Sequence, residues 1–180
     1  IETCTKHNTG CHTNCVVPGL TGNNICRSFL MHSDDDGLTW SPAVEITAQV
    51  KRPTQARAVA SGPGIGIQKR RAPHAGRILF PFNQLDTSGH WWNYAVFSDD
   101  GGATWNYGTL VDDTQTPGQG NEVQFVERSD GSVLLNSRSN GGTRHRKTAV
   151  SVNGGATFMP MSEDAKLNEP QVMASVLRFT

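Results

Sequence analysis

The sequence of 180 residues has no long apolar run and no excess of charge of either sign. No stretch approaches the ~18 consecutive apolar residues of a membrane-spanning helix, which excludes such a helix. The 16 Lys and Arg residues balance 16 Asp and Glu, so the basic surface that nucleic acid or an anionic membrane requires is not expected. These absences predict a partner that is small or neutral, and no nucleic-acid partner.

Cysteines are few, and all of them lie near the start of the chain. The four are Cys4, Cys11, Cys15 and Cys26. An even, clustered set predicts one or two local disulfides, in any of three connectivities, and therefore an extracellular or secretory location. His7 and His12 lie among them, but no C-x2-C spacing supports the alternative of a zinc site. We interpret residues 1–27 as a Cys-rich segment, and the start at Ile1 instead of Met indicates a processed product or a fragment.

Turn-forming residues are abundant. Nineteen Gly and nine Pro argue for many turns between short strands and against a helical bundle. One eight-residue pattern, S-x-D-x-G-x-T-W, occurs at 33–40, at 98–105 and, with Asn and Phe substituted, at 151–158. The separations of 65 and 53 residues suit one four-stranded propeller blade plus its loops.

Each octet has the composition of a turn between two antiparallel strands. Asp35, Asp100 or Asn153 can accept backbone N–H bonds inside the turn, and a glycine two residues later can take a positive φ. Calcium binding by the adjacent aspartates is the functional alternative, but no twelve-residue calcium loop with a terminal Glu follows. The aromatic residue that ends each octet is expected to wedge between neighbouring sheets. These residues are Trp40, Trp105 and Phe158.

Strand-like runs flank the octets and predict three hairpins. Runs at 28–31, 94–97 and 148–150 precede them, and apolar residues resume at 44–46 and 110–111.

Three such octets are the Asp boxes of the sialidase (neuraminidase) superfamily, and residues 40–180 resemble the exo-α-sialidases. Further matching segments carry the resemblance in order along the chain. They are A-S-G-P-G-I-G-I-Q at 60–68, G-R-I-L-F-P at 76–81, N-E-V-Q at 121–124, S-D-G-S-V-L-L-N-S-R at 129–138, and E-P with A-S-V-L-R within 169–178.

The resemblance implies an all-β fold: a β-propeller of antiparallel four-stranded blades, with residues 28–180 forming about three blades of a six-bladed sialidase fold. It implies a glycosidase that releases terminal sialic acid from glycoconjugates, so the partner is a sialylated glycan. The chemistry uses a covalent intermediate on a tyrosine, and no cofactor or metal is implied.

Two site residues follow from the resemblance. Glu122 matches the catalytic glutamate, which draws a proton from the nucleophilic tyrosine. Arg138, 16 residues further on, matches the middle one of three arginines that bind the substrate carboxylate. A planar guanidinium suits this role because it donates two parallel charge-assisted hydrogen bonds.

Glu122 and Arg138 are expected to meet. They flank the Asp130-Gly131 turn, so one hairpin returns both side chains to the same end of a sheet, opposite across the ladder. We expect them within several ångströms of each other, partly open to solvent in a cleft at the rim opposite the octet.

The family's acid/base aspartate and several other catalytic groups have no counterpart in this sequence. Residues 1–32 contain no Asp, Met173 stands where the family has a glutamine, and Tyr94 and Tyr107 match no catalytic position. The alternative is therefore a non-catalytic sialidase-like propeller that acts as a secreted glycan-binding or structural module. About three blades leave a propeller open, so the rest of a longer chain, a second copy or the Cys-rich segment would have to close it.

Two further features have both a structural and a functional interpretation. The charged runs at 69–71 and 144–147 are interpreted as solvated loop charge in preference to a glycan-binding patch. Trp91 and Trp92 either stack on a sugar or pack in the core.

Overall fold

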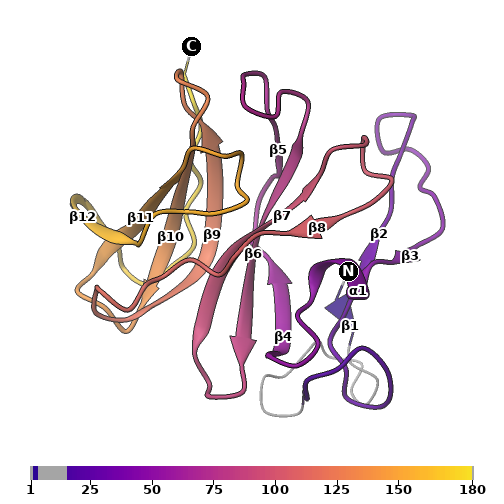
Figure 1. The fold of residues 1–180 in the computed structure, drawn as a ribbon, viewed down its shortest axis with the longest axis horizontal. Coiled ribbons are helices and arrows are strands. Elements are labelled where there is room, and N and C mark those ends of the chain that lie inside the picture. Colours follow the sequence, from indigo (N-terminus) through magenta and orange to yellow (C-terminus); the bar gives the residue numbers. More distant parts are fainter. Residues whose placement is uncertain (1, 4–15, 180) are drawn as a thin grey trace.

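The structure, a computed structural model, describes residues 2–3 and 16–179. The strands of this part form three antiparallel sheets that lie side by side (Figure 1). Sheet 1 has the order β1-β2-β3 and contains β1 (Glu2–Thr3), β2 (Arg27–Leu30) and β3 (Val44–Glu45). Its link to sheet 2 includes α1 (Thr47–Val50). None of the described helices is long and apolar enough to span a membrane.

Sheets 2 and 3 are larger. Sheet 2 has the order β4-β6-β7-β8, with β5 paired to β6, and contains β4 (Ala56–Ser61), β5 (Ile67–Gln68), β6 (Ile78–Asp86), β7 (Trp91–Ser98) and β8 (Asn106–Tyr107). Sheet 3 has the order β12-β11-β10-β9 and contains β9 (Gln119–Glu127), β10 (Val133–Asn140), β11 (His145–Ser151) and β12 (Ser162–Asn168). The expected all-β architecture of antiparallel sheets is confirmed.

Two apolar clusters join the three sheets. The first lies between sheets 1 and 2 and includes Cys26, Ile46, Val59 and Tyr94. The second lies between sheets 2 and 3 and is built on Leu79, Ala95, Val123, Phe125 and Leu135. Successive side chains of a strand point to opposite faces, so sheet 2 buries both of its faces: β7 contributes Tyr94 to the first cluster and Ala95 to the second.

The octets connect β2 to β3 in sheet 1, β7 to β8 in sheet 2 and β11 to β12 in sheet 3. In each octet the side-chain oxygen at the third position accepts hydrogen bonds from the serine hydroxyl and from the threonine backbone N–H. For Asp35 and Asp100, the threonine hydrogen bonds lower the carboxyl pKa to about 2. Asn153 Oδ1 accepts from the serine hydroxyl and the threonine N–H without a charge, and its Nδ2 donates to Thr157 Oγ1 at 2.8 Å. The prediction of turns that satisfy their own polar groups is confirmed.

The three octet aromatics do not behave alike. Trp105 is 5% exposed and packs against Phe80 in the first cluster. Phe158 stacks on Phe125 beside the second cluster. Trp40 is 59% exposed, so the expectation that it wedges between sheets is wrong for the described chain. Trp105 and Phe158 each pack toward the preceding sheet, and no described sheet precedes sheet 1.

Other expectations need correction. Residues 110–111 do not form a strand: β8 ends at Tyr107 and Val111 is buried as part of a loop. Lys69 is not solvated, because it is buried and pairs with Glu127 at 3.0 Å. Arg70 and Arg71 are exposed, as expected.

The disulfide prediction concerns mainly residues that lie outside the described part. These are Cys4, Cys11 and Cys15. Cys26 is buried, with its Sγ 3.4 Å from the carbonyl oxygen of Val59. The interpretation of residues 1–27 as a separate Cys-rich segment stays a prediction.

Candidate active site

Glu122 and Arg138 lie on the two arms of the β9–β10 hairpin. The turn forms around Asp130 and Gly131: Arg128 N donates to Ser132 O at 2.8 Å, and Gly131 has a φ of 84°. A positive φ of this size favours glycine. The hairpin and its turn are therefore where the sequence predicted them.

The strand pairing changes register beside the two residues. Val123 pairs with Ser137, but the next pair is Gly120 with Ser139. Two residues of β9, Asn121 and Glu122, consequently face the single Arg138 of β10. This is a β-bulge, a feature that re-aims side chains beside functional sites, and the sequence analysis did not foresee it.

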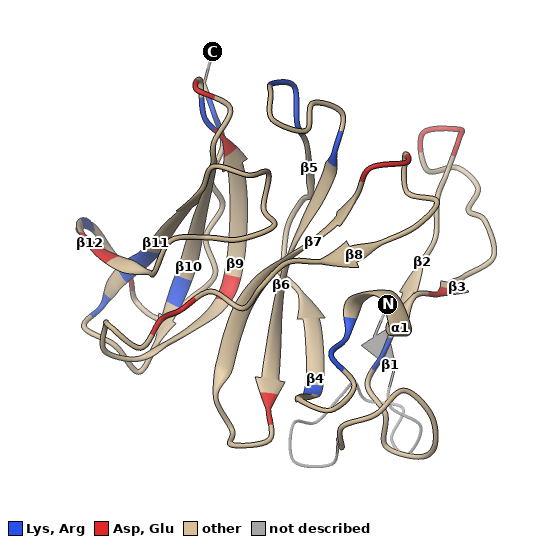
Figure 2. Cartoon of the chain, in the orientation of Figure 1, with Lys and Arg blue, Asp and Glu red and all other residues tan. Residues whose placement is uncertain are grey.

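The bulge brings the two charged side chains together. Arg138 Nη1 donates to Glu122 Oε2 at 3.0 Å. The Arg138 side chain is 25% exposed and that of Glu122 is 31% exposed. The acidic segment of β9 lies beside basic segments of β10 and β11 (Figure 2). The expected contact and partial exposure are confirmed, while the cleft around the pair stays a prediction.

The pair lies at the end of sheet 3 away from the octet. Val133, at the start of β10, pairs with Ser151, where the third octet begins, and Arg138 lies five residues further along β10. Placement at the end opposite the octet is confirmed. Nη1 is the only guanidinium nitrogen of Arg138 with a hydrogen-bond partner in the described chain, so the guanidinium retains donors for an anionic ligand.

A second arginine lies close to this pair. Arg146, on β11, is 4% exposed and donates from Nε to Asn136 Oδ1 at 2.7 Å and from Nη1 to Val172 O at 2.9 Å. Burial lowers the pKa of Arg146 below its usual value, and the negative charges of Glu169 and Glu122 offset only part of this shift. Glu169 is also buried, and its carboxylate accepts from the backbone N–H groups of Ser139 and Val172. These contacts hold residues 169–172 against β10 and β11.

The expectation of solvated charge at 144–147 is therefore wrong for two residues. Arg146 and Lys147 are buried, at 4% and 0% exposure, whereas Arg144 is exposed. Three charges within four residues resemble a loop, but the run is continuous with the strand-like residues that lead to the third octet. That continuity is the signal by which the buried positions could have been found.

The two described tyrosines lie in sheet 2, on β7 and β8. Tyr94 is fully buried and donates to Val50 O at 2.8 Å, and Tyr107 lies under the guanidinium of Arg52. Both tyrosines therefore have structural roles in sheet 2, which agrees with the absence of a sequence match to a catalytic tyrosine.

The two tryptophans differ in their surroundings. Trp91 packs against the first apolar cluster, which favours the core interpretation for that residue. Trp92 is partly exposed, packs against the tilted ring of His90 with ring centroids 4.2 Å apart, and donates from Nε1 to Asp86 Oδ2 at 2.8 Å. Sugar stacking by Trp92 stays a prediction.

Comparison with known proteins agrees with this geometry. The family model described as the BNR repeat-like domain matches residues 12–179. A sialidase from Micromonospora viridifaciens is 38% identical over 156 residues, which cover 86% of this chain and 23% of that protein. A sialidase from Bacteroides fragilis is 32% identical over 161 residues, which cover 89% of this chain and 28% of that protein.

Solved structures show the same relationship. A Hadza microbial sialidase superposes with a TM-score of 0.77 and 30% identity, covering 93% of this chain and 31% of the other. The intramolecular trans-sialidase of Ruminococcus gnavus, solved with oseltamivir carboxylate, gives a TM-score of 0.67 at 26% identity, covering 81% of this chain and 28% of the other. The fold is thus that of sialidase β-propellers. The chain belongs to the BNR repeat-like domain family of the sialidase superfamily, and it spans less than a third of the length of these relatives.

Proposed function

We propose that this chain is part of an exo-α-sialidase, a glycosidase that releases terminal sialic acid from glycoconjugates outside the cell or in the secretory pathway. The observation that carries the proposal is the Glu122–Arg138 pair, formed at a β-bulge in a sialidase fold. The catalytic set is incomplete in this chain, so activity requires groups that other parts of the protein supply.

Each residue of the pair has a separate role in the proposal. Arg138 binds the sialic acid carboxylate, because its guanidinium has unused donors and is partly exposed. Glu122 acts on a tyrosine from outside the described residues and draws off its proton as the phenol attacks the anomeric carbon.

A fluorogenic sialoside assay on the intact protein tests the proposal. Glu122→Gln is expected to lower turnover by about 10²–10⁴-fold, because general-base assistance is lost. Arg138→Ala is expected to weaken binding by ~1.5–3 kcal/mol, the usual loss for a hydrogen bond to a charged group. Arg144→Ala, which removes an exposed arginine of the turn between β10 and β11, is the matched control. Absence of turnover in intact protein that contains a tyrosine and an acid/base aspartate would refute the enzymatic proposal.

The second candidate is a non-catalytic glycan-binding module. It is favoured by Met173, which is exposed where the family has a glutamine, and by the lack of Asp in residues 1–32. Calorimetry with sialyllactose separates the two candidates. Binding that is lost in Arg138→Ala, without turnover in the intact protein, supports this candidate, whereas equal heats for both proteins contradict any sialic-acid site at Arg138.

A further inference from the structure

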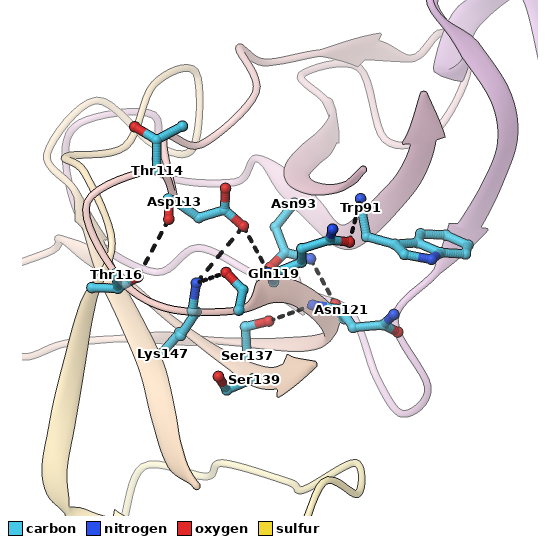
Figure 3. Close-up of polar contacts among 12 residues, drawn as sticks. Trp91, Asn93, Asp113, Thr114, Thr116, Gln119, Asn121, Ser137, Ser139 and Lys147 are labelled. Atoms are coloured by element: carbon cyan, nitrogen blue, oxygen red, sulfur yellow. Dashed lines mark hydrogen bonds and ion pairs between the residues drawn. The ribbon is translucent and has the colours of Figure 1, made fainter. Parts of the chain in front are cut away.

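The bulge that aims Glu122 frees backbone polar groups from the β-ladder, and buried groups of this kind need other partners. Asn121 is the residue affected. Its N–H donates to Ser137 Oγ at 3.0 Å, and its carbonyl oxygen accepts from Asn93 Nδ2 at 2.6 Å. Ser137 and Asn93 are both 0% exposed. They reach Asn121 from β10 and from β7, so side chains of two different sheets hold the bulge (Figure 3).

The residues before the bulge are held in the same way. Gly120 N donates to Asp113 Oδ2 at 2.7 Å, and Asp113 is 1% exposed. Gln119 Oε1 accepts from Trp91 N at 3.0 Å. Figure 3 shows these contacts converging on the start of β9. Three consecutive residues before Glu122 are thus each held by another segment.

Neighbouring side chains leave little space around residues 118–121. A Cβ at Gly120 would lie 2.3 Å from Asn93 Oδ1 and 3.1 Å from Met161 Cε. Asp113 also contacts His90 Nε2 at 2.9 Å, and Lys147 donates to Gly118 O at 2.6 Å. The path of residues 118–121 is therefore determined by hydrogen bonds and by packing together.

We propose that Asn93, assisted by Asp113, is a positioning residue for Glu122. Asn93 fixes the Asn121 carbonyl, and Asp113 fixes the Gly120 amide, so that the bulge directs the Glu122 carboxylate to Arg138. The consequence for turnover rests on the proposed sialidase function, whereas the effect on the geometry of the bulge does not.

Asn93→Asp tests the donor directly. The new carboxyl has the shape of the amide, but when ionised it has no proton to donate to the Asn121 carbonyl. Turnover of a fluorogenic sialoside by the intact protein is expected to fall about 10- to 100-fold at neutral pH. As the pH falls, the new carboxyl becomes protonated and can donate again. The turnover of Asn93→Asp, divided by that of the wild type at the same pH, should therefore rise. Asn93→Ala has no donor at any pH and should not recover.

Asn83→Asp is the matched control. Asn83 pairs directly with Asn93 in the β6–β7 ladder and is 3% exposed, but it makes no described contact with residues 119–122. The turnover of Asn83→Asp should depend on pH in the same way as that of the wild type. The proposal is overturned if Asn93→Asp follows the wild-type profile, or if Asn83→Asp shows the same pH-dependent recovery.

Amide hydrogen exchange provides a measurement that does not depend on activity. Asn93→Ala is expected to accelerate exchange at Asn121 and Glu122 by about tenfold or more, and Asn83→Ala should leave it unchanged. Ser137→Ala removes the acceptor of the Asn121 amide and should accelerate exchange at the same residues. It replaces Asn93→Ala as the test variant if the Asn93 variants do not fold. Absence of cleavage by the wild type would refute the proposed function alone, whereas unchanged exchange in both Asn93→Ala and Ser137→Ala would refute the positioning role.

Discussion

Lys69 and Glu127 form a buried ion pair that joins sheets 2 and 3, and removal of its acid is expected to destabilise the fold strongly. The Lys69 side chain is 0% exposed and that of Glu127 is 7% exposed, with Nζ and Oε1 3.0 Å apart. Glu127→Gln leaves the ammonium group buried without its counter-charge, which costs about 3–5 kcal/mol. The acceptors that remain, Gly131 O and the amide oxygen of the substituted side chain, are neutral and cannot replace the negative charge of the carboxylate.

Removal of the lysine of the pair is expected to cost less stability than removal of the acid. In Lys69→Met the Glu127 carboxylate keeps two backbone donors, Arg70 N at 2.9 Å and Arg71 N at 3.0 Å. The free energy of unfolding should therefore fall by only about 1–3 kcal/mol. Because both substitutions remove the same interaction, the double variant should cost less than the two single losses combined.

Urea denaturation of the four proteins measures these differences, with Arg71→Ala as the control. Arg71 is exposed and contributes to the pair only through its backbone, so its truncation should change stability by less than about 0.5 kcal/mol. The reasoning is refuted if Glu127→Gln costs no more than Arg71→Ala, or if the two losses are additive.

The same pair predicts a pH dependence. Burial raises the pKa of Glu127, but the hydrogen bonds from Arg70 N, Lys69 and Arg71 N outweigh it, and the net pKa is lowered. A lowered folded-state pKa contributes stability above the unfolded value of ~4.3 and loses it as pH falls through the folded value. Glu127→Gln should remove this part of the acid sensitivity.

Three other predictions concern the octets and a close backbone approach. Trp105→Ala should cost about 3–5 kcal/mol in chemical denaturation, whereas Trp40→Ala should cost much less because that side chain is 59% exposed. The carboxyls of Asp35 and Asp100 should titrate near pH 2 by NMR, since their pKa values are about 2; the stability they contribute is present above ~3.9 and lost as pH falls through 2, and values near 3.9 would contradict the turn geometry. Gly62→Ala should destabilise the fold by about 1–3 kcal/mol, because its Cβ would meet a β9 carbonyl oxygen at 2.0 Å; unchanged unfolding would contradict that contact.

The parts of the structure that the sequence predicted depend on local chemistry. Octet turns are built from residues two and four positions apart, so Asp100 and Thr104 meet whatever surrounds them. The Glu122–Arg138 contact was predictable because one hairpin with a recognisable turn connects the two residues. The resemblance to sialidases added their expected roles, which geometry alone does not assign.

The parts that were missed depend on contacts between sheets. Burial of Lys69 requires Glu127, which lies 58 residues away, and no local pattern links the two. Asn93 likewise holds Asn121 across 28 residues, and a single asparagine within a strand is not a recognisable signal. The exposure of Trp40 depends on which sheets flank it, whereas the octets of sheets 1 and 2 share the same S-x-D-x-G-x-T-W pattern.

The bulge in β9 also changes which positions of that strand point toward sheet 2. After it, Val123 and Phe125 turn toward sheet 2; before it, Gly120 does so, since Asn93 and Met161 limit its space. The inward positions are thus three residues apart at this point, where an unbroken strand has them two apart. A substitution scan along β9 should accordingly show a two-residue alternation of tolerance that changes phase at Asn121, and deletion of that residue should remove the bulge and leave the inward positions two residues apart along the whole strand.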